Sequence, residues 1–107
     1  MLAQTSSTPY YAVIFTSIRT DVENGYDDMA TKMVDIGSTM EGFLGIETAR
    51  SEIGITVSYW ESLEHIKLWK QHAEHLIAQQ EGRKQWYAAY KTRICMVVRD
   101  YGFEKED

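Results

Sequence analysis

The feature that most constrains the fold is a strand-forming segment, residues 10–19, that is apolar on both of its faces. Its sequence, YYAVIFTSIR, is rich in the β-branched and aromatic residues that suit a pleated, packed surface. The two alternating sets of side chains are Tyr10, Ala12 and Ile14, and Tyr11, Val13 and Phe15. A sheet with one face in water would alternate apolar with polar residues. Both faces of this strand therefore need cover.

The rest of the chain carries alternating helix and strand signals. Helical spacing of apolar residues runs from Tyr26 to Met40 and stops at Gly42, which predicts a helix of about four turns. The further predicted elements are strands over residues 43–51 and 55–60, a helix from Leu63, and a last strand over residues 91–101. The short segment 52–54 predicts an antiparallel hairpin between the two middle strands.

The order strand, helix, strand, strand, helix, strand predicts an α+β fold of the ferredoxin-like βαββαβ type, with both helices on one face of a four-stranded antiparallel sheet. The last strand is also apolar on both faces, and the chain has no further element to cover the second face. We therefore predict a homodimer joined through its sheet faces. Residues 10–101 form a single domain, preceded by a flexible arm, residues 1–9, and followed by an acidic tail, residues 102–107.

The composition of the chain argues against several classes of binding partner and cellular location. The formal net charge is -5 and no basic cluster occurs, which argues against nucleic acid and anionic membrane surfaces. Cys95 is the single cysteine; it excludes an intramolecular disulfide, and we expect it to be a small buried apolar residue. The apolar run near the N-terminus is too short for a signal sequence or a membrane span, so we expect a cytoplasmic protein.

The central stretch, residues 54–76, holds all three histidines of the chain. Ser62 is placed to cap a new helix, whose apolar residues occupy one arc that should face the sheet. That arc consists of Leu63, Ile66, Trp69, Ala73, Leu76 and Ile77. On the same helical wheel, His65 and His72 border the arc and His75 lies further toward solvent.

The segment SYWESLEHIKLWKQHAEH, followed by GRKQWYAAYKTRI and RDY, resembles the antibiotic biosynthesis monooxygenase family over roughly residues 10–101. The resemblance implies the dimeric α+β barrel fold, in which two ferredoxin-like sheets pack together. Proteins of that fold include cofactor-independent oxygenases of polycyclic phenols, haem-degrading enzymes, isomerases and small stress-related proteins. Fold membership alone therefore does not decide the chemistry.

The function that the resemblance implies is oxidation of a small aromatic phenol or quinol by dioxygen without a cofactor. His72 is the expected catalytic base, because imidazole titrates near neutral pH. The residues expected to bind the hydrophobic or aromatic ligand are Tyr59, Trp60, Trp69, His75 and Trp86. His72 and His75 are three residues apart, but no third ligand is evident and we predict no metal site. Arg50 and Arg99 are expected to form ion pairs at the subunit interface.

Two alternatives stay open on the sequence. The first is a non-catalytic, stress-related module that binds a hydrophobic small molecule. The second is weak haem binding through His72 or His75, although the first strand lacks the asparagine that haem-degrading relatives share.

Overall fold

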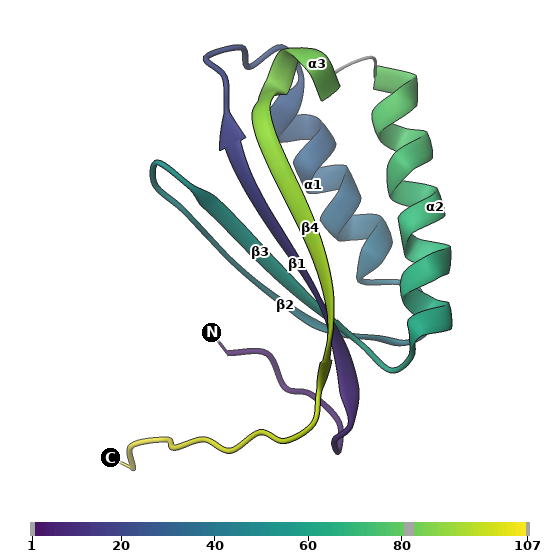
Figure 1. The fold of residues 1–107 in the computed structure, drawn as a ribbon, viewed down its shortest axis with the longest axis vertical. Coiled ribbons are helices and arrows are strands. Elements are labelled where there is room, and N and C mark those ends of the chain that lie inside the picture. The colour runs from purple at the N-terminus through teal and green to yellow at the C-terminus, as the bar shows by residue number, and fades with distance from the viewer. Residues whose placement is uncertain (1, 81–82, 107) are drawn as a thin grey trace.

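The computed structural model describes residues 2–80 and 83–106, and their side chains outside residues 76–80 and 83–84. The elements follow the predicted order, with a short helix added before the last strand (Figure 1). They are β1 (Tyr10–Arg19), α1 (Tyr26–Gly37), β2 (Phe43–Arg50), β3 (Gly54–Trp60), α2 (Leu63–Gln80), α3 (Arg83–Trp86) and β4 (Tyr87–Val97). The ferredoxin-like α+β prediction is confirmed.

The four strands form one antiparallel sheet in the order β2-β3-β1-β4. Both long helices lie on the same side of this sheet, and the β2–β3 hairpin projects away from them (Figure 1). Residues directly opposite each other in neighbouring strands point to the same face, so the pairing defines rows across the sheet. We call the two sides the helix face and the open face.

The rows of the helix face change in character from one end of the sheet to the other. The rows, read from β2 to β4, are Phe43–Trp60–Tyr11–Met96, then Ile46–Ser58–Val13–Ile94, then Thr48–Thr56–Phe15–Thr92, then Arg50–Gly54–Ser17–Tyr90. The first two rows are mostly apolar, whereas the last carries a charge and two hydroxyls. The helix face thus has an apolar end and a polar end.

The structure tests the predicted ends of the two long helices. The Oγ of Ser62 accepts a hydrogen bond from the backbone N–H of His65 at 3.1 Å, which caps α2 as predicted. The predicted length of α1 is wrong: the helix ends at Gly37, and residues 38–42 turn back to the sheet. Within the predicted arc of α2, Ile66 is 3% exposed and buried as expected, but Leu63 at the start of the helix is 55% exposed. The side chains of Leu76 and Ile77 lie outside the described set.

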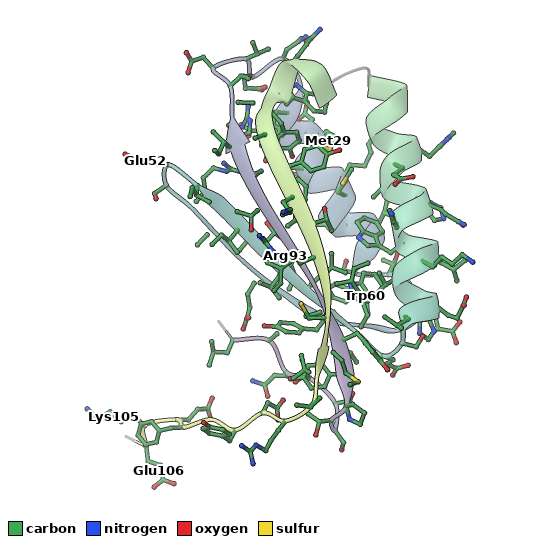
Figure 2. All side chains as sticks on the ribbon, in the orientation of Figure 1. Met29, Glu52, Trp60, Arg93, Lys105 and Glu106 are labelled. Atoms are coloured by element: carbon green, nitrogen blue, oxygen red, sulfur yellow. The ribbon has the colours of Figure 1, made fainter. Side chains whose placement is uncertain are left out.

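The core lies between the sheet and the helices, with Met29 and Trp60 both pointing into this layer (Figure 2). Trp60 is 1% exposed, and its indole N–H donates to Ser58 Oγ at 2.9 Å, so its polar atom is satisfied. Among the described residues, no helix is long and apolar enough to cross a membrane.

The open face bears the apolar side chains that the sequence predicted for it, and the N-terminal arm covers one end of it, where Ala3 lies against Gly45 and Tyr10 and Ala12 are each 4% exposed. Ile18 is 47% exposed and Ile55 is 45% exposed on this face. The prediction that Cys95 is buried is wrong: Cys95 lies on the open face and is exposed. Its apolar surroundings therefore come from neighbours beside it and not from a layer above it.

The N-terminal arm makes hydrogen bonds near both edges of the sheet, with β2 and with the segment that follows β4. The N–H of Ala3 donates to Glu47 Oε2 at 3.0 Å, and Thr5 Oγ1 donates to Asp100 at 3.4 Å, so the N-terminal arm is tied to the domain. The acidic tail instead extends away from the body (Figure 1), with Tyr101 91% exposed and Phe103 83% exposed.

Candidate functional site

Two of the residues predicted to bind a ligand are brought together by the fold. The rings of Trp60 on β3 and Trp69 on α2 stack, with centroids 6.0 Å apart and planes at 21°. A Cβ added to Gly37 of α1 would lie 3.4 Å from the Trp69 ring, so this ring also contacts the other helix. The pair fills the space between both helices and the apolar end of the sheet.

Two other predicted residues lie elsewhere. Tyr59 is on the open face, where its hydroxyl donates to Glu47 Oε1 at 2.6 Å. Burial, followed by this hydrogen bond, raises the pKa of Tyr59 to about 12. Trp86 lies at the opposite end of the sheet beside Arg19, about 26 Å along β1 from the level of Trp60 by the rise of a strand. Tyr59 and Trp86 therefore do not share a site with Trp60.

The two histidines proposed for chemistry are exposed on α2. Trp69 faces Gly37 and the ring of His65 lies against Gly42, so this edge of α2 is turned toward α1. On the helical wheel, His72 lies beyond His65 in the same direction, away from the sheet. Within the described part of the chain, neither His72 nor His75 makes a hydrogen bond or an ion pair.

Sequence reasoning missed a surface along β4. Tyr90, Ile94 and Met96 belong to the helix-face rows, yet they are 42%, 48% and 54% exposed. The helix layer thus leaves this edge strand half open. We call these three residues the β4 shelf. It offers flat apolar contacts of the kind that an aromatic ring needs.

At the polar end of the helix face, Arg50 reaches across the sheet. Its Nη2 donates to Ser17 Oγ at 2.5 Å, and its Nη1 lies 3.5 Å from the Ser17 carbonyl oxygen. The guanidinium passes over Gly54, where an added Cβ would lie 2.1 Å from its Cζ. Arg50 therefore bonds inside its own subunit, and the ion pair that Arg50 was expected to form at a subunit interface stays a prediction.

Tyrosines and a second arginine surround this position. The guanidinium carbon of Arg19 lies 3.4 Å from the centroid of the Tyr26 ring, and Arg19 donates to the carbonyl oxygens of Trp86 and Val22 at 3.1 and 2.9 Å. Tyr87 packs edge-on against Tyr26, with centroids 5.8 Å apart. The arginine–tyrosine cluster, as we name it, consists of Ser17, Arg19, Tyr26, Arg50, Tyr87 and Tyr90.

Two opposite effects act on the pKa of the Tyr87 hydroxyl in this cluster. Burial raises the pKa of the Tyr87 hydroxyl, and hydrogen bonding with Tyr26 raises it further. The positive charges of Arg50 and Arg19 lower it by a smaller amount. The phenol therefore stays neutral at physiological pH, while both guanidinium groups lie close enough to influence it.

A β-bulge explains why this cluster was hard to foresee. Ile18 pairs with Ala89 but Arg19 pairs with Tyr87, so Ala88 is an extra residue in β4. Tyr87 and Tyr90, three residues apart, consequently share one face, whereas a regular strand would separate them. The strand begins four residues before its predicted start, and the predicted range 91–101 is wrong at both ends. The only available signal was the aromatic group before the strand.

No group of three potential metal ligands occurs among the described residues. The candidate site consists of the β4 shelf beside the helix layer and of the arginine–tyrosine cluster at the polar end of the helix face. The sheet, with both long helices on one face, defines an α+β domain of the ferredoxin-like type. The chain belongs to the antibiotic biosynthesis monooxygenase family, whose model matches residues 9–81.

The chain is also similar to individual proteins in sequence or in fold. The chain is 42% identical over 106 residues to the uncharacterized protein YqjZ of Bacillus subtilis (strain 168), covering 97% of this chain and 93% of that protein. Its fold is similar to that of PA3566 from Pseudomonas aeruginosa, with a TM-score of 0.66 at 13% identity over 88% of this chain and 97% of the other. It is similar also to SnoaB, a cofactor-independent oxygenase from Streptomyces nogalater, with a TM-score of 0.65 at 4% identity over 92% and 100% of the two chains.

Proposed function

We propose that the protein is a cofactor-independent monooxygenase that oxidises a small aromatic or polycyclic phenol or quinol with dioxygen. Membership of the monooxygenase family supports the reaction class. The observation that carries the proposal is the β4 shelf, where Tyr90, Ile94 and Met96 stay half exposed on the helix face. A flat apolar substrate fits such a surface better than a sugar or a peptide would.

The chemistry needs no external reductant. When a phenol becomes a quinone, the ring loses one carbon-bound hydrogen and the hydroxyl hydrogen. One atom of dioxygen becomes the new carbonyl oxygen, and the other leaves as water. The substrate supplies all the electrons, so the protein has only to bind it, favour its anion and limit the access of water.

Removal of the phenolic proton by His72 stays a prediction. Its exposed ring lies on the side of α2 that is turned toward α1, whereas the shelf is on β4. The phenolic proton can leave by two routes: transfer to a histidine base, or direct ionisation of the substrate in water. His72→Ala, with His75→Ala as the matched control on the same helix, separates these routes.

We propose in addition that the protein works as a homodimer joined through its open faces. Exposed Ile18 and Ile55 lie on the same side of a row in which Glu47 of β2 and Arg93 of β4 occupy opposite edges, with Val57 and Ile14 between them. In a twofold arrangement the same surface meets itself, so an acidic edge can face a basic edge. The apolar centre would then be buried on both copies.

Oxygen uptake tests the proposed function directly. The protein is incubated in air with a panel of naphthols, anthrones and quinols, and consumption of dioxygen is measured against a heat-denatured sample. We expect uptake with at least one polycyclic phenol. If the whole panel gives only the background rate of the denatured sample, the protein is not an oxygenase of this class.

A second candidate, a non-catalytic binding protein, is favoured by the packing of Trp60 and Trp69. Their stacked rings lie between the helices and the sheet, and Trp60 is 1% exposed, so the protein's own side chains fill this part of the layer. A binding protein would bind the same aromatic compounds without consuming dioxygen. Binding and uptake measured on the same samples distinguish the two functions.

A further inference from the structure

Arg50 is a charged group without a charged partner. Among the described residues, no carboxylate lies within 4.0 Å of its guanidinium, and its hydrogen bonds go to the two oxygens of Ser17. A guanidinium carries more N–H donors than one serine can accept. The protein as a whole has a net charge of -5, so acidic residues are plentiful elsewhere. This arginine is therefore a local positive site on an acidic protein.

The backbone around Arg50 is shaped to hold the guanidinium flat on the sheet. Arg50 and Gly54 are paired at the end of the β2–β3 hairpin, and only hydrogen at Gly54 leaves room for the side chain to cross. Ser17, which receives it on β1, is 1% exposed. Arg50 itself is exposed. One side of the guanidinium is therefore anchored while the group stays open to solvent.

Aromatic rings border this position in its own row of the helix face and in the rows on either side of it. Phe15 lies 5.4 Å from Tyr90 and 5.6 Å from Tyr87, measured between ring centroids. Tyr90 is at once a member of the β4 shelf and the row partner of Ser17, which Arg50 contacts. The apolar shelf and the cationic group are thus continuous along one face of the sheet.

We infer that Arg50 is the anion-binding element of a site for a planar aromatic ligand that carries a carboxylate or an ionised hydroxyl. The ring of the ligand lies on the β4 shelf beside Phe15, and its anionic oxygen accepts hydrogen bonds from the guanidinium. A planar guanidinium forms two parallel hydrogen bonds with a carboxylate and also stacks on rings.

The inference deepens the proposed function and rests on it only for the identity of the reaction. A positive charge a few ångströms from a bound phenol favours the ionised form, which is the form that reacts with dioxygen. Arg50 would therefore both select an anionic substrate and prepare it for oxidation. Binding without turnover is measurable under nitrogen, independently of any oxygenase activity.

Three probes and three variants test the site. The probes are hydroxynaphthoate, naphthol and methoxynaphthalene, titrated under nitrogen by the quenching of tryptophan fluorescence. Arg50→Gln removes the charge. Gly54→Ala keeps the charge but places a methyl group where the guanidinium now lies. Arg99→Gln, beyond the far end of β4, is the control for an equal loss of charge at a distance.

We expect the wild-type protein to bind hydroxynaphthoate, and Arg50→Gln and Gly54→Ala to weaken this binding by roughly ten- to a hundredfold, as the loss of a charge-assisted hydrogen bond implies. Arg99→Gln and the neutral probe should show less than a twofold change. Wild-type protein should bind naphthol more tightly above the pKa of naphthol than below it, and Arg50→Gln should lack this gain; that result would identify the ionised hydroxyl as a sufficient anion.

The inference is overturned if wild-type protein does not bind hydroxynaphthoate, if both Arg50→Gln and Gly54→Ala bind it as wild type does, or if Arg99→Gln loses as much affinity. Circular dichroism establishes that each variant is folded, and Gly54→Ala decides the question should Arg50→Gln fail to fold. Oxygen uptake in air, with no binding under nitrogen, would leave the proposed oxygenase standing and remove this site.

Discussion

Two glycines with the same backbone conformation allow the packing of the α2 N-terminus to be measured. Gly25 and Gly42 both have φ of +87°, a left-handed conformation that side chains disfavour. A Cβ at Gly25 would meet nothing within 4 Å, whereas a Cβ at Gly42 would lie 2.2 Å from Cγ of His65. The stability lost on substituting Gly25 therefore measures the backbone penalty alone. The stability lost on substituting Gly42 contains the same penalty and, in addition, the collision with the imidazole ring.

The expected magnitudes follow from these contacts. Gly25→Ala should lower the free energy of unfolding by about 1–2 kcal/mol, the penalty for a left-handed residue with a side chain. Gly42→Ala should lower it by a further 1–3 kcal/mol or so, because overpacking forces neighbours to move. The ring cannot swing away freely, since His65 Nδ1 is hydrogen-bonded to Ser62 Oγ at 2.7 Å.

Urea unfolding at one fixed protein concentration is the assay, because a dimer would make stability depend on concentration. Adding His65→Ala to Gly42→Ala removes the ring, so the double variant should be more stable than the two single effects predict by about the size of the collision term. Equal losses for Gly25→Ala and Gly42→Ala would refute the packing of His65 on this loop. A purely additive double variant would refute it as well.

Three further predictions concern the open face. Ile55→Glu should convert the dimer into monomers in sedimentation velocity, while Ile53→Glu at the hairpin tip should not; a dimer that survives Ile55→Glu would contradict the proposed interface. The thiol of Cys95 should react with a maleimide faster as the protein is diluted, and a rate independent of concentration would mean that the open face is uncovered. The pKa of Glu47 is lowered, chiefly by the hydrogen bond from Tyr59, so its contribution to stability is present above the ordinary value near 4.5 and is lost as pH falls below it. Tyr59→Phe should therefore lose less stability than wild type between pH 6 and pH 3, and identical losses would show that this hydrogen bond does not stabilise the folded state.

Much of the fold was predictable because it depends on the hydrophobic pattern. The order of helix and strand signals selected one topology, which the structure has, whereas the cover predicted for the second face of residues 10–19 stays a prediction. The turn at Ser62 was predictable for the same kind of local reason, since a serine hydroxyl caps the helix that follows it. These features need only information from neighbouring residues.

The candidate site was less predictable because it depends on the register of the strands and on how far side chains extend from one strand to the next. An extra residue in β4, Ala88, puts Tyr87 and Tyr90 on one face, and no local signal announces such a bulge. Arg50 bonds to Ser17 only because Gly54 leaves its path open, a contact between three strands. Tyr59 and Trp60 are adjacent in sequence, and strand geometry therefore sends them to opposite faces.

Incubation with isotopically heavy dioxygen, followed by mass spectrometry of the product, tests the proposed reaction most directly. The protein is supplied with a phenol that it binds, in ordinary water, and each quinone molecule should gain one heavy oxygen atom while the second appears in water. Arg50→Gln should form the same labelled product more slowly. A quinone whose new oxygen is light, or a rate equal to that of denatured protein, would contradict an oxygenase that takes its electrons from the substrate.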